Sequence, residues 1–153
     1  TLALHPILMN KWNENKNIHD SLMKLFQASL IQIIIFIIML IPLFIFKDSF
    51  FYLIQAMIPE LDNSMKKIMI HIFIGGFLWQ IALVLHKPLE IEERTLIMVV
   101  CIIFSLLINL IGNIYFLPKF GILATGYIMI ISALTYIISS ILFSKSFRKL
   151  KKR

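Results

Sequence analysis

The sequence predicts an all-α membrane protein, a polytopic helix bundle with four transmembrane helices. Three observations carry this prediction: 59% of the 153 residues are apolar, only 15% are charged, and the apolar residues gather in four long uncharged runs. Soluble domains contain about 25% charged residues. The composition therefore excludes a water-soluble fold of this size.

The four runs define spans at about residues 25–46, 68–85, 95–117 and 121–144. A hydrocarbon core of about 30 Å requires about 20 apolar residues in a helix. β-Branched residues are frequent in the runs, but lipid leaves backbone groups no external partner, which favours helices. The alternative, a β-barrel, requires strands of about ten residues with alternating polarity, and no segment alternates in this way.

The connections between the spans differ in length. Residues 86–94 form a short turn and residues 117–121 a tight hairpin, so consecutive helices are expected to be antiparallel neighbours. Residues 47–67 hold an aromatic interfacial anchor and then a polar break, or else the start of a long, kinked second helix. Residues 1–9 are interpreted as the end of a preceding helix, so residues 1–153 are expected to be the C-terminal transmembrane portion of a longer protein.

The basic residues predict the topology. Residues 1–24, 86–94 and 145–153 hold eleven Lys and Arg residues, whereas the other connections hold four. Positive residues favour the cytoplasmic side, so we expect a multi-pass protein of the cytoplasmic membrane with its C-terminus, the basic tail at residues 145–153, in the cytoplasm. In so apolar a chain the basic charge indicates topology and contact with membrane lipids, not binding of nucleic acid.

Few residues within the spans can carry covalent chemistry. The sequence has no metalloprotease, hydrolase or paired-cysteine motif and no pair of carboxylates within a span, and Cys101 is the sole cysteine. We therefore expect no enzymatic activity, no metal and no cofactor.

Polar side chains within the spans are the candidate site. His71 is the one titratable residue of a span other than Cys101 and Tyr residues; it either relays an ion or bonds a neighbouring carbonyl group, and we favour the second. Stripes on the third and fourth spans either line a substrate cavity or bond helix to helix, with the second slightly favoured. The stripes are Ser105, Asn109 and Asn113, and Ser132, Thr135 and Ser139.

Small residues in the last three spans permit close approach of helix backbones, and we interpret them as packing positions. They are Gly75, Gly76, Gly112, Gly121, Ala124 and Gly126.

The segment between the third and fourth spans resembles a known family. It reads Asn109-Leu110-Ile111-Gly112-Asn113-Ile114-Tyr115-Phe116-Leu117-Pro118-Lys119-Phe120-Gly121-Ile122-Leu123-Ala124-Thr125-Gly126. It is similar to polysaccharide flippases of the Wzx type, within the multidrug and oligosaccharidyl-lipid exporter superfamily, in which an Asn-rich helix ends in Leu-Ile-Pro-x-Tyr-Gly and is followed by Ile-x-Gly-Ala-Ala. Here Ala124-Thr125-Gly126 replaces Gly-Ala-Ala and keeps the side chains small.

The resemblance implies the last four helices of a two-bundle transporter. Such a protein moves an undecaprenyl-diphosphate-linked oligosaccharide from the inner to the outer leaflet, coupled to an ion gradient, with the missing N-terminal helices of the same chain as its structural partner. Because no Lys or Arg lies within a span, diphosphate-binding charges are expected in those helices. The alternatives are a four-helix assembly subunit of a membrane complex and a small multidrug exporter.

Overall fold

The computed structural model describes the backbone of residues 18–145 and the side chains of residues 23–63 and 65–145, and this part of the chain is helical without strands. The predicted end of a preceding helix at residues 1–9 and the basic tail beyond Lys145 lie outside the described residues. The fold class is confirmed: four helices are long and apolar enough to cross a membrane.

Each long helix overlaps one of the four apolar runs. The long helices are α2 (Ile18–Ile45), α4 (Lys66–Leu85), α6 (Thr95–Phe120) and α7 (Ile122–Phe143). The short elements are α3 (Lys47–Met57), a 3-10 turn (Asn63–Met65) and α5 (Lys87–Ile91).

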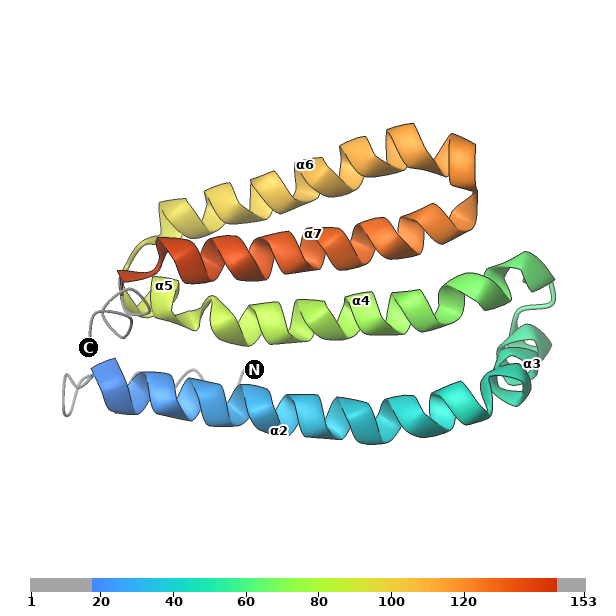
Figure 1. Ribbon diagram of the computed structural model, residues 1–153, viewed down its shortest axis with the longest axis horizontal. Coiled ribbons are helices and arrows are strands. Elements are labelled where there is room, and N and C mark those ends of the chain that lie inside the picture. The colour runs from blue at the N-terminus through green and yellow to red at the C-terminus, as the bar shows by residue number, and fades with distance from the viewer. Residues whose placement is uncertain (1–17, 146–153) are drawn as a thin grey trace.

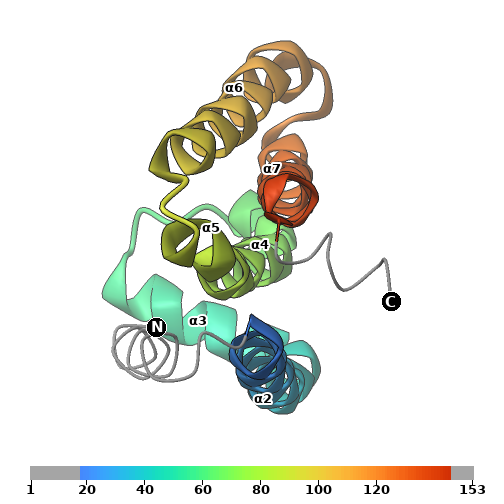
Figure 2. The ribbon, with the colours of Figure 1, turned by 90° about the vertical axis from the view of Figure 1, so that its left-hand side faces the viewer.

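The long helices lie in a row, not in a closed four-helix bundle. Their order across the row is α6, α7, α4, α2 (Figures 1 and 2). Contacts are most extensive between α7 and its neighbours α4 and α6, while α2 packs mainly on α4, with the rings of Phe36 and Phe77 stacked at 3.7 Å. The long helices have α3 near one of their ends and α5 near the other, and we call these ends of the helices the α3 end and the α5 end.

The prediction that consecutive helices are neighbours is wrong for α4 and α6. α7 lies between them, and both pack mainly on it. The physical reason lies in the connection: α5 and the turn that follows it carry the chain from α4 past the end of α7 to the start of α6 (Figure 1).

The linker at residues 47–67 forms a separate helix. α3 lies crosswise to the long helices near the end of α2 (Figures 1 and 2). A turn at residues 58–62 separates it from α4, so the alternative of one long, kinked second helix is wrong. The buried ring of Phe51 holds α3 to the protein. The ammonium group of Lys66 lies 2.8 Å from the Asp48 carboxylate, and this hydrogen bond lowers the pKa of Asp48.

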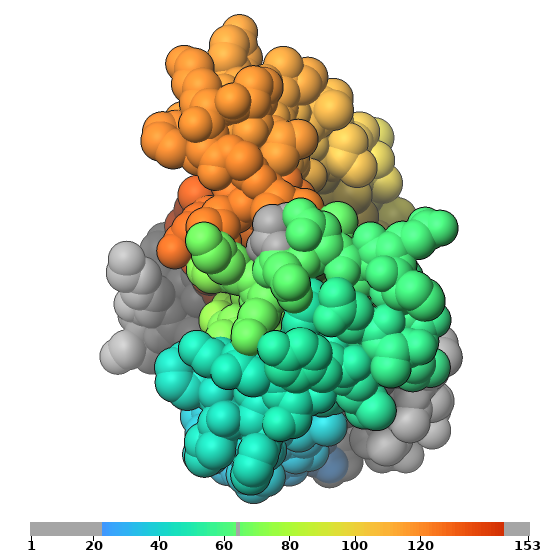
Figure 3. Space-filling view, turned by 90° about the vertical axis from the view of Figure 1, so that its right-hand side faces the viewer, coloured from blue at the N-terminus to red at the C-terminus, as the bar shows by residue number. Residues whose placement is uncertain are grey.

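The predicted hairpin at residues 117–121 is wrong in extent. α6 continues through Pro118 to Phe120, and the chain reverses at Gly121 alone, which has φ +69° and ψ −165°. A backbone of this kind is open essentially only to glycine. Figure 3 shows the α3 end, with the α6–α7 hairpin at the top and α3 below.

Gly121→Ala is expected to lower the free energy of unfolding by about 1–3 kcal/mol, because the added Cβ is strained at this backbone conformation. Reversible unfolding in mixed lipid–detergent micelles measures it. Gly76→Ala is the control: no atom outside its own helix backbone lies within 4 Å of the added Cβ, and alanine favours the helix by about 0.5–1 kcal/mol. Equal losses in the two variants would contradict the assignment of Gly121 as the turn residue.

Candidate functional site

Polar side chains of α6 and α7 meet in a buried network about halfway along the two helices. The Ser105 hydroxyl donates to the Ser132 carbonyl oxygen at 2.6 Å, and Nδ2 of Asn109 donates to the Ser132 hydroxyl at 3.2 Å. Ser105 and Ser132 are fully buried. The structure therefore brings three of the predicted residues together in one helix-to-helix contact.

Asn113 extends this network along α6 toward the α3 end. Its Nδ2 donates to the carbonyl oxygen of Asn109 at 2.8 Å and lies 3.2 Å from the side-chain oxygen of Asn109. The side-chain oxygen of Asn113 is buried and accepts no hydrogen bond from the described part of the chain. The side-chain oxygen of Asn113 is therefore a buried acceptor without a donor from this part of the chain.

The second predicted stripe does not act as a unit. The Thr135 hydroxyl donates to the Ile131 carbonyl oxygen at 2.8 Å, and the Ser139 hydroxyl donates to the Tyr136 carbonyl oxygen at 3.0 Å. Both bonds stay within α7, as is common for hydroxyl side chains in helices. Of this stripe, Ser132 alone bonds to α6, so the interpretation of Thr135 and Ser139 as cross-helix contacts is wrong.

His71 lies at the contact of α4 with α7. Its Nδ1 is 3.1 Å from the carbonyl oxygen of Lys67, one turn earlier in α4, and its ring centroid is 4.5 Å from that of Tyr127. This is the favoured one of the two interpretations, in which the imidazole bonds a neighbouring carbonyl group.

Three of the predicted glycines sit where a side chain of the neighbouring helix enters. A Cβ added at any of them would lie within 3.0 Å of that side chain, far inside ordinary contact distance. The contacts pair Gly75 of α4 with Met129 at 2.8 Å, Gly112 of α6 with Ile128 at 2.9 Å, and Gly126 of α7 with His71 at 2.6 Å. Ala124 is also buried.

Within the described part of the chain, the other two glycines are not packing positions. No atom of a neighbouring element lies within 4 Å of a Cβ built at Gly76 or Gly121. Gly76 follows Gly75 by about 100° around α4, so it does not share the contact of Gly75 with Met129. Gly121 is required for its positive φ.

A polar cluster at the α5 end was missed by the sequence reasoning. His86 is only 7% exposed, and its Nε2 lies 2.9 Å from one oxygen of Glu90, while Nζ of Lys87 lies 2.6 Å from the other. The four-residue spacing of His86 and Glu90 around Pro88 is the signal for a helical turn that could have found it.

The same end is closed by contacts between the α5–α6 turn and the end of α7. The Glu92 carboxylate accepts the Ser144 hydroxyl at 2.8 Å and the Lys145 backbone N–H at 3.0 Å, and the Arg94 guanidinium donates to the Phe143 carbonyl oxygen. We call these contacts the inner clasp. They join the end of α7 to the turn between α5 and α6.

Neither polar region has the composition of a metal site. Among the side chains of residues 23–63 and 65–145, no group of three or more His, Cys, Asp or Glu is placed to hold a metal ion. What the geometry offers is hydrogen bonding between helices and close backbone contact.

Comparison with known proteins finds no relative: no family model, no curated protein and no solved structure matches the chain.

Asn109 and Ser132 are expected to be energetically coupled. In a double-mutant cycle of Asn109→Leu and Ser132→Ala, we expect a coupling of about 0.5–1.5 kcal/mol, the range of hydrogen bonds between helices in lipid. Unfolding in micelles measures it. Asn109→Leu with Thr135→Val is the control and should be additive, because Thr135 bonds within α7. Additivity in both cycles would show that the Asn109–Ser132 bond contributes nothing.

The inner clasp is expected to stabilise the last turn of α7. Both oxygens of the Glu92 carboxylate accept hydrogen bonds, and Glu92→Gln leaves only one acceptor oxygen. The backbone amides of the last turn of α7 should therefore exchange with deuterium about tenfold faster, which corresponds to a loss of about 1.4 kcal/mol in local stability. Exchange followed by mass spectrometry measures it. The neighbouring Glu93, which is exposed, provides the control Glu93→Gln, and identical exchange in the two variants would disprove the clasp.

Proposed function

We propose that this chain is the C-terminal portion of a flippase that moves a lipid-linked oligosaccharide across the cytoplasmic membrane. Four helices long and apolar enough to span a membrane fit a multi-pass protein. The proposal of flippase activity rests on the resemblance of residues 109–126 to Wzx-type flippases and on the contacts that those residues make between helices.

The observation that carries the proposal is the tight unit formed by α4, α7 and α6. The resembling segment supplies several of its contacts: Asn109 bonds Ser132, Gly112 accepts the Ile128 side chain, and Gly126 accepts His71. Alternating access requires groups of helices that move as rigid bodies around a central site. A unit held by close backbone contact suits that motion.

The proposed mechanism needs no covalent step. The sugar and diphosphate must cross a medium of low dielectric constant, so a cavity between two helix groups has to replace their water while the lipid chain stays in the bilayer. This row of helices would form one wall of the cavity. The charges that hold the diphosphate, and coupling to an ion gradient, are assigned to helices outside this sequence.

The proposed orientation follows the distribution of basic residues. The α5 end, with the inner clasp, faces the cytoplasm, and the α3 end faces the opposite side. α3 then lies along the outer interface with Tyr52, 60% exposed, among the headgroups.

An assembly subunit is the second candidate, favoured by the loose attachment of α2. Only 6% of its membrane-crossing window is buried, against 39% for α7. An outward face of this kind could receive a helix of another protein.

Depletion of the full-length protein distinguishes the two candidates. We expect lipid-linked oligosaccharide to accumulate in the inner leaflet, and complementation by Gly76→Ala but not by Gly126→Val, whose side chain would displace His71. Leaflet labelling of the oligosaccharide measures the distribution. An unchanged distribution would reject the flippase, and loss of a co-purifying complex in its place would favour the assembly subunit.

A further inference from the structure

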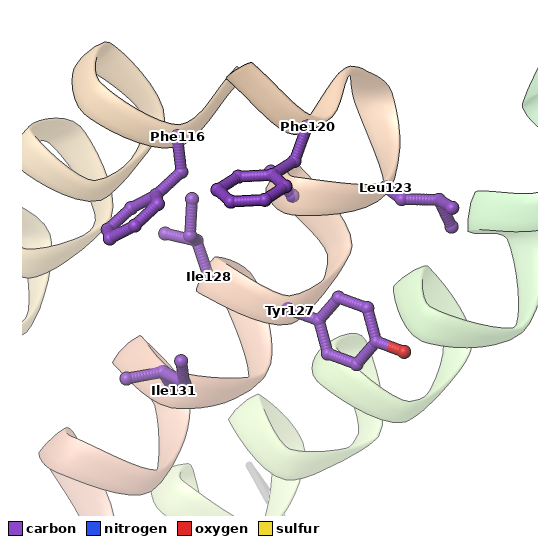
Figure 4. A pocket seen from close by; sticks show the side chains of 7 residues that line it. Phe116, Phe120, Leu123, Tyr127, Ile128 and Ile131 are labelled. Carbon is purple, nitrogen blue, oxygen red and sulfur yellow. The ribbon is translucent and has the colours of Figure 1, made fainter. Parts of the chain in front are cut away.

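An apolar groove opens between α6 and α7 near the α3 end. It has a volume of about 400 Å³. Its walls are Phe116 and Phe120 of α6 and Leu123, Ala124, Tyr127, Ile128 and Ile131 of α7 (Figure 4).

The groove follows from the backbone of this hairpin. At Gly112 the two helices are in close contact, because the Ile128 side chain enters α6 there. Beyond that point α6 separates from α7 toward the turn (Figure 1), and the extended turn at Gly121 keeps the two helix ends apart. The rings of Phe116 and Phe120, 6.0 Å apart, form the wall on the α6 side.

The groove is open to the surroundings of the helix row. Phe116, Phe120 and Ile131 are between 49% and 67% exposed. The one polar group among the lining side chains is the Tyr127 hydroxyl, which points away from the groove toward α4 in Figure 4. A ligand of this groove must therefore be a hydrocarbon.

The last turn of α6, which carries the groove residue Phe120, also carries a basic residue. Lys119, which is exposed, directly precedes Phe120 in the last turn of α6. An ammonium group is a good partner for a phosphate. The groove thus pairs an apolar surface for a chain with a cation for a phosphodiester.

We propose that the groove binds one acyl chain of a membrane phospholipid while Lys119 binds its phosphate. Phospholipid is the hydrocarbon present at the highest concentration around a membrane-spanning helix, and occupancy follows concentration. The bound chain fills the space beside α6 and α7 that their own side chains leave open. This site is independent of the proposed flippase activity, since it requires only that the helices span a bilayer.

The first test titrates the full-length protein in detergent with phosphatidylglycerol and counts bound lipids by native mass spectrometry. Phe116→Ala with Phe120→Ala should weaken the tightest binding about tenfold, or ~1.4 kcal/mol, because the α6 wall of the groove is lost. Both rings are exposed, so the fold should survive. The control, Leu110→Ala with Ile114→Ala, removes side chains that are equally exposed on the same helix and should leave that binding unchanged.

The charge is tested separately. Lys119→Gln should weaken the same binding, and Lys119→Arg should restore it. Equal effects of the groove pair and the control pair would overturn the proposal, as would unchanged affinity in the groove pair.

A photoreactive benzoylphenylalanine at position 120 identifies the occupant in native membranes. The expected adduct has the mass of a phospholipid. An adduct with a polyprenyl lipid or with another segment of protein would overturn the assignment, whatever the outcome of the transport experiment.

Discussion

The fold depends on the close approach of α7 to two helices at once. Three glycines make it possible, because each leaves room for a side chain from the neighbouring helix. Two of them, Gly75 and Gly112, lie on the outer helices of the trio and accept Met129 and Ile128, consecutive residues of α7. In lipid no hydrophobic force drives helices together, so such contact, with the Asn109–Ser132 hydrogen bond, must supply the attraction.

The central place of α7 explains the rest of the arrangement. With α7 inserted between α4 and α6, the connection between those two helices must pass its end, and α5 with the inner clasp does so while satisfying the last backbone groups of α7. At the α3 end, α6 and α7 separate toward the turn at Gly121, and the groove opens between them. α2 lies outside this unit and contacts it mainly through α4, so the row consists of a tight trio and one loosely attached helix.

Most of the fold is predictable from the sequence because uncharged runs of about 20 residues leave little choice in a bilayer. The hydrogen-bond partners of the polar residues are harder to predict from the sequence. Ser132 and Ser139 are alike in the sequence, and both hydroxyls donate to a carbonyl oxygen of α7, yet Ser132 alone of the two also accepts a hydrogen bond from α6. The difference depends on the rotation of α7. The insertion of α7 and the burial of His86 come from tertiary packing that spacing along the chain does not encode. The resemblance to flippases stays a prediction.

Cysteine cross-linking of the full-length protein in membranes, with Cys101 replaced by Ser, tests the central place of α7 most directly. A Cβ at Gly75 lies 3.4 Å from that of Met129, close to the separation in disulfides, about 3.5–4.5 Å. The pair Gly75→Cys with Met129→Cys should therefore cross-link rapidly on mild oxidation. The pair Gly75→Cys with Gly112→Cys should stay reduced, because α7 lies between the two glycines. Cross-linking of the second pair without the first would contradict the insertion of α7 between α4 and α6.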